Sequence, residues 1–302
     1  MFFQTFRKIE INIRKDLQMK KYAFKQATGT IDFTFTNDYM FRAVLEKNQK
    51  VLKALICALL HLEPSIIRSV EITNPITLGD CKDDKDFILD IHVALNDDTD
   101  INLEMQVKRQ SYWTERSLSY LCRTFDRLTE GENYDESKAA IHIGILDFTP
   151  FPDIPEFYAS HKLMNVKNHH IYSSKFILNV LDLTQINIAT EEDKAYRIDY
   201  WARLFKAQTW EDINMVAEKD ENLCEASESL YMLNTDDITR QKCRARQEQL
   251  IREEKMKRKI NTLTSENATL TYENETLTHK NETLTQENEA LKKLLEANNI
   301  SY

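Results

Sequence analysis

Two segments near the middle of the chain carry the side chains whose types and spacing could do chemistry together. Residues 86–95 (DFILDIHVAL) and 100–108 (DINLEMQVK) alternate between apolar and polar positions, as strands with one face in a core do. The turn residues NDDT between them predict a hairpin, in which the carboxylates of Asp90 and Glu104 converge if the two polar faces match. An amide and an amine follow on the polar face of the second strand: Gln106 and Lys108. The alternative is a merely solvated polar face, which antiparallel sheets commonly have.

Composition narrows the class of protein. The 302 residues carry a net charge of −9, so no overall basic field points to nucleic acid, and DNA binding requires a local basic path. The five cysteines are scattered without a CxxC pair, which predicts reduced thiols in a cytoplasmic protein. No apolar run reaches about 18 residues, so we expect no membrane-spanning helix. With four glycines in the chain, a glycine-rich phosphate loop is excluded.

The elements around the hairpin predict an α/β core in which helices cover a mixed sheet. Residues 38–61 carry a helical apolar stripe, which predicts one or two helices; the N-cap candidates are Thr36, Asn37 and Asp38, and the segment ends before Pro64. The remaining expected elements of the core are a helix at 113–129 and strands at 66–73, 139–148 and 175–183.

Four segments follow from these patterns. They are an N-terminal arm (1–30), the α/β domain (31–190), a helical extension packed on that domain (191–239), and a basic helix with a coiled coil (240–302). The boundary near residue 191 is placed where the pattern becomes helical only.

A heptad repeat near the C-terminus predicts the coiled coil. Leucine recurs every seven residues from Leu263 to Leu291, and asparagine every seven from Asn267 to Asn288. With leucine at d, the asparagines fall at a. Leucine at d favours a parallel homodimer through residues 260–295, whereas buried asparagine at a fixes the register and lowers the stability of the dimer. The alternatives are a trimer and a single polar helix in solvent, which is marginally stable in water.

Arginine and lysine are concentrated just before the repeat, over residues 240–259. A basic helix that leads into a leucine zipper is the layout of bZIP DNA-binding proteins. The asparagine–alanine–arginine pattern with which those proteins contact bases is not present. Three interpretations stay open: bZIP-like regulation, in which residues from Arg240 onward bind DNA alone with sequence preference; non-specific contact with phosphate; and a solvated helix with i,i+4 ion pairs.

The segment from Thr36 to about Leu183 resembles the PD-(D/E)XK nuclease superfamily, and more narrowly the Rpn family of recombination-promoting nucleases and transposases. The residues that carry the resemblance are NDYMFRAVL, KDFILDIHVAL with INLEMQ, WTERSLSYLCRTF, GENY and IHIGILDF. The helical stretch from Tyr196 to Ala226 is also similar, whereas the zipper lies outside the resemblance. The resemblance implies a restriction-endonuclease-like fold and a nuclease that acts on DNA.

Roles for the hairpin residues follow from the same resemblance. Asp90 and Glu104 hold the positions of the superfamily's Mg²⁺ ligands, with Mn²⁺ as the alternative ion, and hard carboxylate oxygens suit such ions. Gln106 stands where the superfamily has a lysine; its amide cannot carry charge but can orient a water. Lys108, two residues on, would supply the missing charge, unless it is a solvated lysine at a strand end.

Further candidates lie on the neighbouring helices and on the first strand. Asp38 is a candidate third acid near the metal, or a favourable charge at a helix N-terminus. Arg116 and Arg123, seven residues apart on one helix face, are candidates for binding DNA phosphate, or ordinary surface arginines. Asp86 and His92 share the face of Asp90 and are weaker candidates.

We therefore expect a Mg²⁺-dependent DNA endonuclease linked to recombination or transposition, with the zipper holding two nuclease domains together. The alternative is a catalytically inactive DNA-binding or assembly protein that keeps the nuclease fold. The presence of Asp90, Glu104 and Gln106 together favours the enzyme.

Overall fold

The computed structural model describes residues 24–74, 90–109, 112–126 and 133–297. The chain divides into two compact units, one ending at Arg246 and the other beginning at Gln247. Most of the predicted N-terminal arm and the first residues of the predicted hairpin, with Asp86, lie outside the described residues. In the described ranges, no helix combines the length and the apolar composition needed to cross a membrane.

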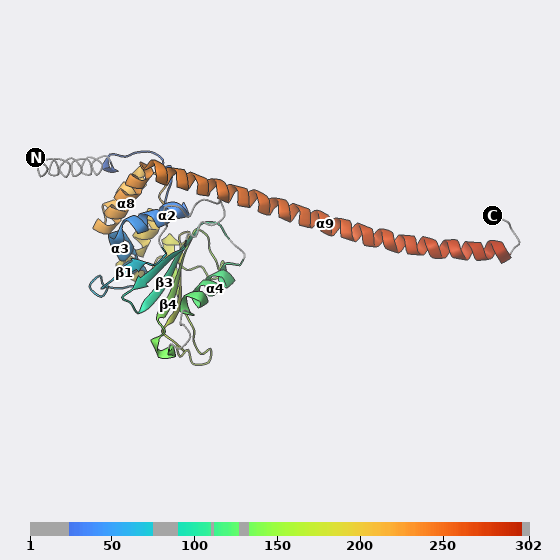
Figure 1. The fold of residues 1–302 in the computed structure, drawn as a ribbon, viewed down its shortest axis with the longest axis horizontal. Helices are drawn as coiled ribbons and strands as arrows, with labels where there is room; N and C mark the ends of the chain where they lie inside the picture. The colour runs from blue at the N-terminus through green and yellow to red at the C-terminus, as the bar shows by residue number, and fades with distance from the viewer. Residues whose placement is uncertain (1–23, 75–89, 110–111, 127–132, 298–302) are drawn as a thin grey trace, which may run out of the picture. The chain divides into compact units, whose positions relative to one another are not determined.

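The described part of the first unit is built on a mixed sheet with the strand order β1-β2-β3-β4-β6-β5 (Figure 1). Neighbours β1/β2, β2/β3 and β5/β6 are antiparallel, whereas β3/β4 and β4/β6 are parallel. This sheet, flanked by helices, confirms the predicted α/β class. The strands are β1 (Val70–Ile72), β2 (Ile91–Leu95), β3 (Thr99–Gln106), β4 (Ala139–Leu146), β5 (Tyr158–Lys162) and β6 (Phe176–Asp182).

The first helical segment forms two helices, α2 (Asp38–Lys47) and α3 (Gln49–Leu59). Asn37 caps α2, its side chain accepting a hydrogen bond from Met40 N at 3.1 Å. Asn48 ends α2 and caps α3. The N-cap chemistry at the start of this segment therefore acts as the sequence predicts, because an asparagine oxygen satisfies a backbone N–H of the first turn.

Different helices cover the two faces of the sheet. Residues with odd numbers on β2, β3 and β4 face the main core beneath α2 and α3. The opposite face is covered by α4 (Trp113–Phe125), which contacts β3, β4 and β6 (Figure 1). On that face the polar residues Asn102 and Glu104 of β3 are only 1% and 5% exposed. The alternative of a solvated polar face is therefore wrong, since α4 buries it.

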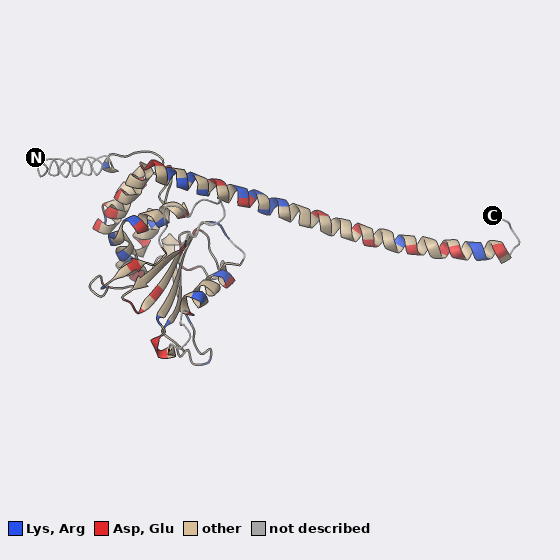
Figure 2. Ribbon diagram, in the orientation of Figure 1, with Lys and Arg blue, Asp and Glu red and all other residues tan. Residues whose placement is uncertain are grey.

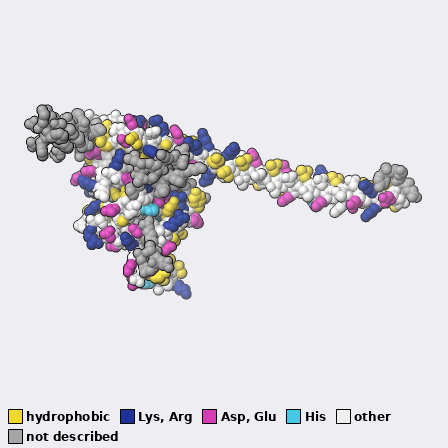
Figure 3. Space-filling model, viewed as in Figure 1, with side chains coloured by type: hydrophobic (Ala, Val, Ile, Leu, Met, Phe, Trp, Pro, Cys, Tyr) yellow, Lys and Arg dark blue, Asp and Glu magenta, His cyan; other side chains and the backbone are white. Residues whose placement is uncertain are grey.

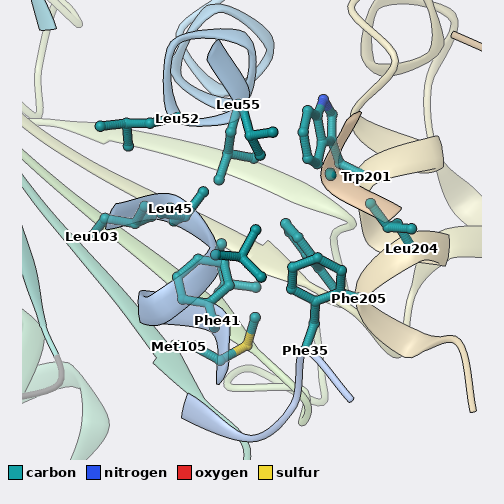
Figure 4. Packing of buried hydrophobic residues seen from close by; sticks show 14 of the residues in the cluster. Phe35, Phe41, Leu45, Leu52, Leu55, Leu103, Met105, Trp201, Leu204 and Phe205 are labelled. Carbon is teal, nitrogen blue, oxygen red and sulfur yellow. The ribbon is translucent and has the colours of Figure 1, made fainter. Parts of the chain in front are cut away.

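The helices after residue 190 share the core of the sheet. Phe205 of α6 (Ile198–Lys206) meets Phe35 edge-on at 5.3 Å and Phe41 of α2 at 5.5 Å between ring centroids. Figure 4 shows these rings with Trp201 between the helices and the sheet. The helices after residue 190 thus pack on the α/β core. The other helices of the extension are α5 (Glu191–Ala195), α7 (Trp210–Ala217) and α8 (Glu221–Asn234).

Two elements differ from the sequence pattern. Strand β5 was not predicted, because YASHK lacks apolar alternation; it lies at the edge of the sheet and is largely exposed. In α4 not all the apolar residues lie on the buried face, since Leu118 and Cys122 are exposed. The buried stripe of α4 consists of Trp113, Ser117, Leu121 and Thr124.

Helix α9 (Asp237–Ala297) begins in the first unit and supplies the second. Lys and Arg are concentrated in its N-terminal part (Figure 2). In the second unit the leucines that repeat from Leu263 to Leu291 are 45–58% exposed, and Figure 3 shows apolar side chains recurring along the helix. The pairing of this leucine stripe in a coiled coil stays a prediction.

Candidate active site

Strand pairing places the two predicted acids opposite each other. The turn between β2 and β3 uses Asn96 and Asp97, both in the left-handed region with φ of 53° and 64°, which these residue types tolerate. The register of the antiparallel ladder, continued one residue beyond Ile91, sets Asp90 opposite Glu104. Opposed residues of this kind have Cβ atoms about 5 Å apart. The hairpin thus brings the two carboxylates to one place, as the alternation predicts.

Asp90 is anchored through both its backbone and its side chain. Arg42 of α2 is buried and donates from Nη1 to Asp90 O at 2.7 Å. Asn74, which follows β1, donates from Nδ2 to the same oxygen at 3.0 Å and accepts from His92 N at 2.8 Å. His92 Nε2 lies 2.9 Å from Asp90 Oδ2, a hydrogen-bond distance. The carboxylate therefore has little freedom to move away from the site.

Glu104 lies on β3 beneath α4. Arg116 donates from Nε and Nη2 to Glu104 Oε1, at 3.1 and 2.8 Å. Glu104 Oε2 is buried and makes no hydrogen bond with any described residue. The guanidinium also lies over the ring of Tyr120, 4.9 Å from its centroid, a cation–π geometry. One carboxylate oxygen is thus paired with an arginine, while the other stays available as a ligand.

Helix α4 approaches the sheet closely because residue 144 has no side chain. Gly144 is the partner of Glu104 in the parallel β3/β4 ladder. A Cβ at this position would overlap the indole of Trp113 and lie 2.7 Å from its Cη2 atom. The glycine therefore lets the indole of Trp113 pack directly against β4, and this contact fixes the first turn of α4, from which Arg116 reaches Glu104.

The two acids have opposite pKa shifts. Burial raises the pKa of Glu104, an effect that Arg116 opposes and the charges of Asp90 and Asp38 reinforce. Burial also pushes the pKa of Asp90 upward, but the hydrogen bond and charge of His92, with smaller contributions from the backbone and a nearby arginine, outweigh it and lower the pKa. Acids whose pKa values are driven apart by their surroundings are typical of functional sites.

Asp38, the predicted accessory acid, is bound by α9. Arg246 donates from Nε to both carboxylate oxygens of Asp38, at 3.1 and 3.0 Å, and from Nη2 to Oδ2 at 2.7 Å. Because the charge of Asp38 acts on Glu104, Asp38 lies within electrostatic range of the site. A role for it at a metal stays a prediction. Arg240 also pairs with Asp32, through Nη2 at 2.9 Å, so two arginines attach the part of α9 that belongs to the first unit to the rest of that unit.

The other predicted residues lie at the end of β3, just beyond it and on α4. Gln106 is the last residue of β3, and its Nε2 donates to Lys108 O at 2.9 Å. Lys108 lies beyond the end of the strand and is exposed, so its predicted place on the strand face is wrong. Arg123 is exposed on α4. The catalytic roles of Gln106 and Lys108 and the phosphate contact of Arg123 stay predictions.

A second polar row lies beside the acids on the same face of the sheet. His92 pairs with Asn102, and Asn102 pairs with His142 of β4. The ring of His142 packs against Tyr120 and Trp113, with 5.9 Å between the centroids in each case. Burial lowers the pKa of His142 to about 4, so its imidazole is neutral at physiological pH.

The donor set at Asp90 and Glu104 fits a hard divalent cation. Carboxylate oxygens are the ligands that Mg²⁺ prefers, and Mg²⁺ is commonly held by one or two carboxylates together with water and substrate phosphate. Glu104 Oε2 is the buried oxygen available for such an ion. Over the described ranges, no group of three or more His, Cys, Asp and Glu side chains is placed so that it could hold a metal ion. The fit therefore rests on the two carboxylates.

Comparison with known families matches residues 35–262 to the PD-(D/E)XK nuclease family transposases. The chain belongs to this family. The match runs from the residues just before α2 into the N-terminal part of α9, and it confirms the resemblance recognised in the sequence. Among curated proteins and among solved structures, no match was found.

In this PD-(D/E)XK family member, sequence reasoning missed two buried residues close to the acids. Arg42 is a charged residue inside the apolar helix segment NDYMFRAVL, and His142 is a lone polar residue inside the apolar strand AAIHIGIL. Both residues could have been recognised in the sequence, because each is a charged or polar residue within an apolar segment. Such residues are rarely buried without a partner or a function.

Proposed function

We propose that this protein is a Mg²⁺-dependent DNA endonuclease that acts in recombination or transposition, with Mn²⁺ as the alternative ion. The observation that carries the proposal is the buried Oε2 atom of Glu104, which has no described partner and lies on the strand next to Asp90. Membership of a nuclease family supports the same chemistry. A nuclease substrate explains why paired acids lie beside an arginine that could contact phosphate.

Each residue near the proposed metal site has a separate role in the reaction. Bound by Asp90 and Glu104, Mg²⁺ would stabilise charge on the scissile phosphate and lower the pKa of a bound water. His92 keeps Asp90 ionised and oriented. Gln106 orients a water through its amide. Arg116 donates two of the five N–H groups of its guanidinium to Glu104, and the remaining N–H groups suit a phosphate oxygen.

Dimerisation through residues 260–295 is part of the proposal. The exposed leucine stripe and the asparagines at a support a parallel homodimer. A dimer contains two copies of the site, so one dimer can cut both strands of a DNA duplex.

Nicking of supercoiled plasmid with Mg²⁺ tests the enzymatic function. We expect the wild type to cut and both Asp90→Ala and Glu104→Ala to fail while they remain folded and keep the oligomeric state of the wild type. Asp100→Asn changes another buried acid of β3 and serves as the matched control, which should cut like the wild type. If the wild type and both alanine variants behave alike, the site is wrong and the protein is a DNA-binding or assembly module.

A further inference from the structure

A pair of buried polar side chains beside the proposed metal ligands has no part in the function described so far. Asn102 of β3 and His142 of β4 are partners in the parallel ladder. They lie on the face that carries Glu104, which is two residues along the strand from Asn102. Asn102 is 1% exposed and His142 is 0% exposed, so neither can exchange hydrogen bonds with bulk water.

Five side-chain atoms gather here without a hydrogen-bond partner among the described residues. They are both amide atoms of Asn102, both ring nitrogens of His142, and Oε2 of Glu104. Buried polar groups nearly always have a partner, because an unpaired group loses its hydration without compensation. An apolar pair would avoid this cost, since Trp113 and Tyr120 already cover His142 with aromatic rings. Polar residues at these two positions therefore do something other than packing.

The charges around the pair belong to the candidate active site. Asp90 and Arg116 both act electrostatically on His142. On the other side, Asn102 is opposite His92, which is hydrogen-bonded to Asp90. The pair thus lies in the row of side chains next to the row that carries the two carboxylates. An amide and a neutral imidazole each offer a donor and an acceptor, and a buried water typically bridges such groups with about three hydrogen bonds.

We propose, resting on the proposed function, that Asn102 and His142 are positioning residues for the metal site. Together, through ordered water, they hold the Glu104 carboxylate from the side that Arg116 does not reach, and so keep Oε2 directed at the divalent ion. They contact neither the ion nor DNA. Partners that orient a metal ligand typically change metal affinity or activity by ~10–100-fold when they are removed.

The test replaces the pair with apolar residues in the full chain, as Asn102→Leu/His142→Phe. Mn²⁺ binding is measured by electron paramagnetic resonance of the free ion, alongside the urea midpoint and the kcat and KM of plasmid nicking. We expect the Kd for Mn²⁺ to rise by ~10–100-fold and kcat to fall. The KM for DNA should stay unchanged, and the urea midpoint should be equal or higher because unpaired polar groups have been removed. If the pair were purely structural, its replacement would lower the urea midpoint and leave the Kd for Mn²⁺ unchanged.

Asn179→Leu is the matched control. Asn179 of β6 is also buried, with an Oδ1 atom that lacks a described partner, but it shares a row with Ile143 on the opposite face of the sheet. We expect this variant to keep the wild-type Kd. If the double variant does not fold, the single variants His142→Gln and Asn102→Leu are compared instead. Because glutamine keeps polar atoms near the position of the ring, we expect His142→Gln to bind Mn²⁺ more tightly than Asn102→Leu.

The outcomes separate this inference from the proposed function. A double variant that binds Mn²⁺ and cuts like the wild type overturns the inference alone, as do equal affinities of His142→Gln and Asn102→Leu. A wild type that neither binds Mn²⁺ nor nicks DNA overturns the proposed function, and the inference with it.

Discussion

Replacing Arg116 by methionine should destabilise the first unit to an extent that depends on pH. The guanidinium makes two charged hydrogen bonds to the buried Glu104 carboxylate. Hydrogen bonds to charged groups contribute ~1.5–3 kcal/mol each. Because the Arg116 side chain is 32% exposed, solvent screens part of this energy. We expect Arg116→Met to lower the free energy of unfolding by about 2–3 kcal/mol near pH 8.

The pH dependence follows from the ionisation of Glu104. Burial raises its pKa in the folded protein, so its contribution to stability is complete below the unfolded-state pKa and is lost as the pH rises through the folded-state pKa. Without Arg116, the folded-state pKa rises further, so the loss continues to higher pH at ~1.4 kcal/mol for each added unit. Near pH 4, below the ordinary pKa of a glutamate, the raised pKa of Glu104 favours the protonated carboxyl with or without Arg116, and the difference should shrink to about 1 kcal/mol.

Urea unfolding followed by tryptophan fluorescence measures this effect. All three tryptophans, Trp113, Trp201 and Trp210, lie in the first unit, so the signal reports on the unit that contains the site. Arg123→Met is the control on the same helix, because Arg123 is exposed and such surface changes stay within about 0.5 kcal/mol. The reasoning is refuted if the loss is equal at the two pH values, or if Arg116→Met is no more destabilising than Arg123→Met.

Three further changes test the packing and the assembly. Gly144→Ala places a methyl group against the indole that packs on this glycine and should cost ~1–3 kcal/mol of unfolding free energy in urea; an unchanged midpoint would contradict the close approach of α4. Asn234→Leu removes the side chain that accepts from Phe33 N at 3.1 Å and donates to Phe33 O at 2.9 Å, and a loss of ~1–3 kcal/mol is expected from the unpaired backbone groups, measured in the same assay. Leu277→Asp puts a charge in the leucine stripe and should shift sedimentation toward monomer; identical sedimentation of this variant and the wild type would argue against the proposed dimer.

The sequence by itself determined the elements that rest on local periodicity. The alternation around Asp90 and Glu104 predicted two strands and the face on which the acids lie, because successive side chains of a strand point to opposite sides. The cap at Asn37 was equally readable, since an N-cap depends on residues within one turn. Strand β5 was missed because an exposed edge strand gains little from apolar alternation, so its sequence does not carry the pattern.

Only the tertiary structure decided what surrounds the acids. The polar face of β3 could have been solvated, and its burial depends on α4 docking against Gly144. The arginine that anchors Asp90 lies 48 residues away in the sequence, and the one that pairs with Asp38 lies 208 residues away. Such contacts arise from the packing of whole elements and leave no local period. For the same physical reason, the pairing of Asn102 with His142 became visible only once β3 and β4 were aligned in register.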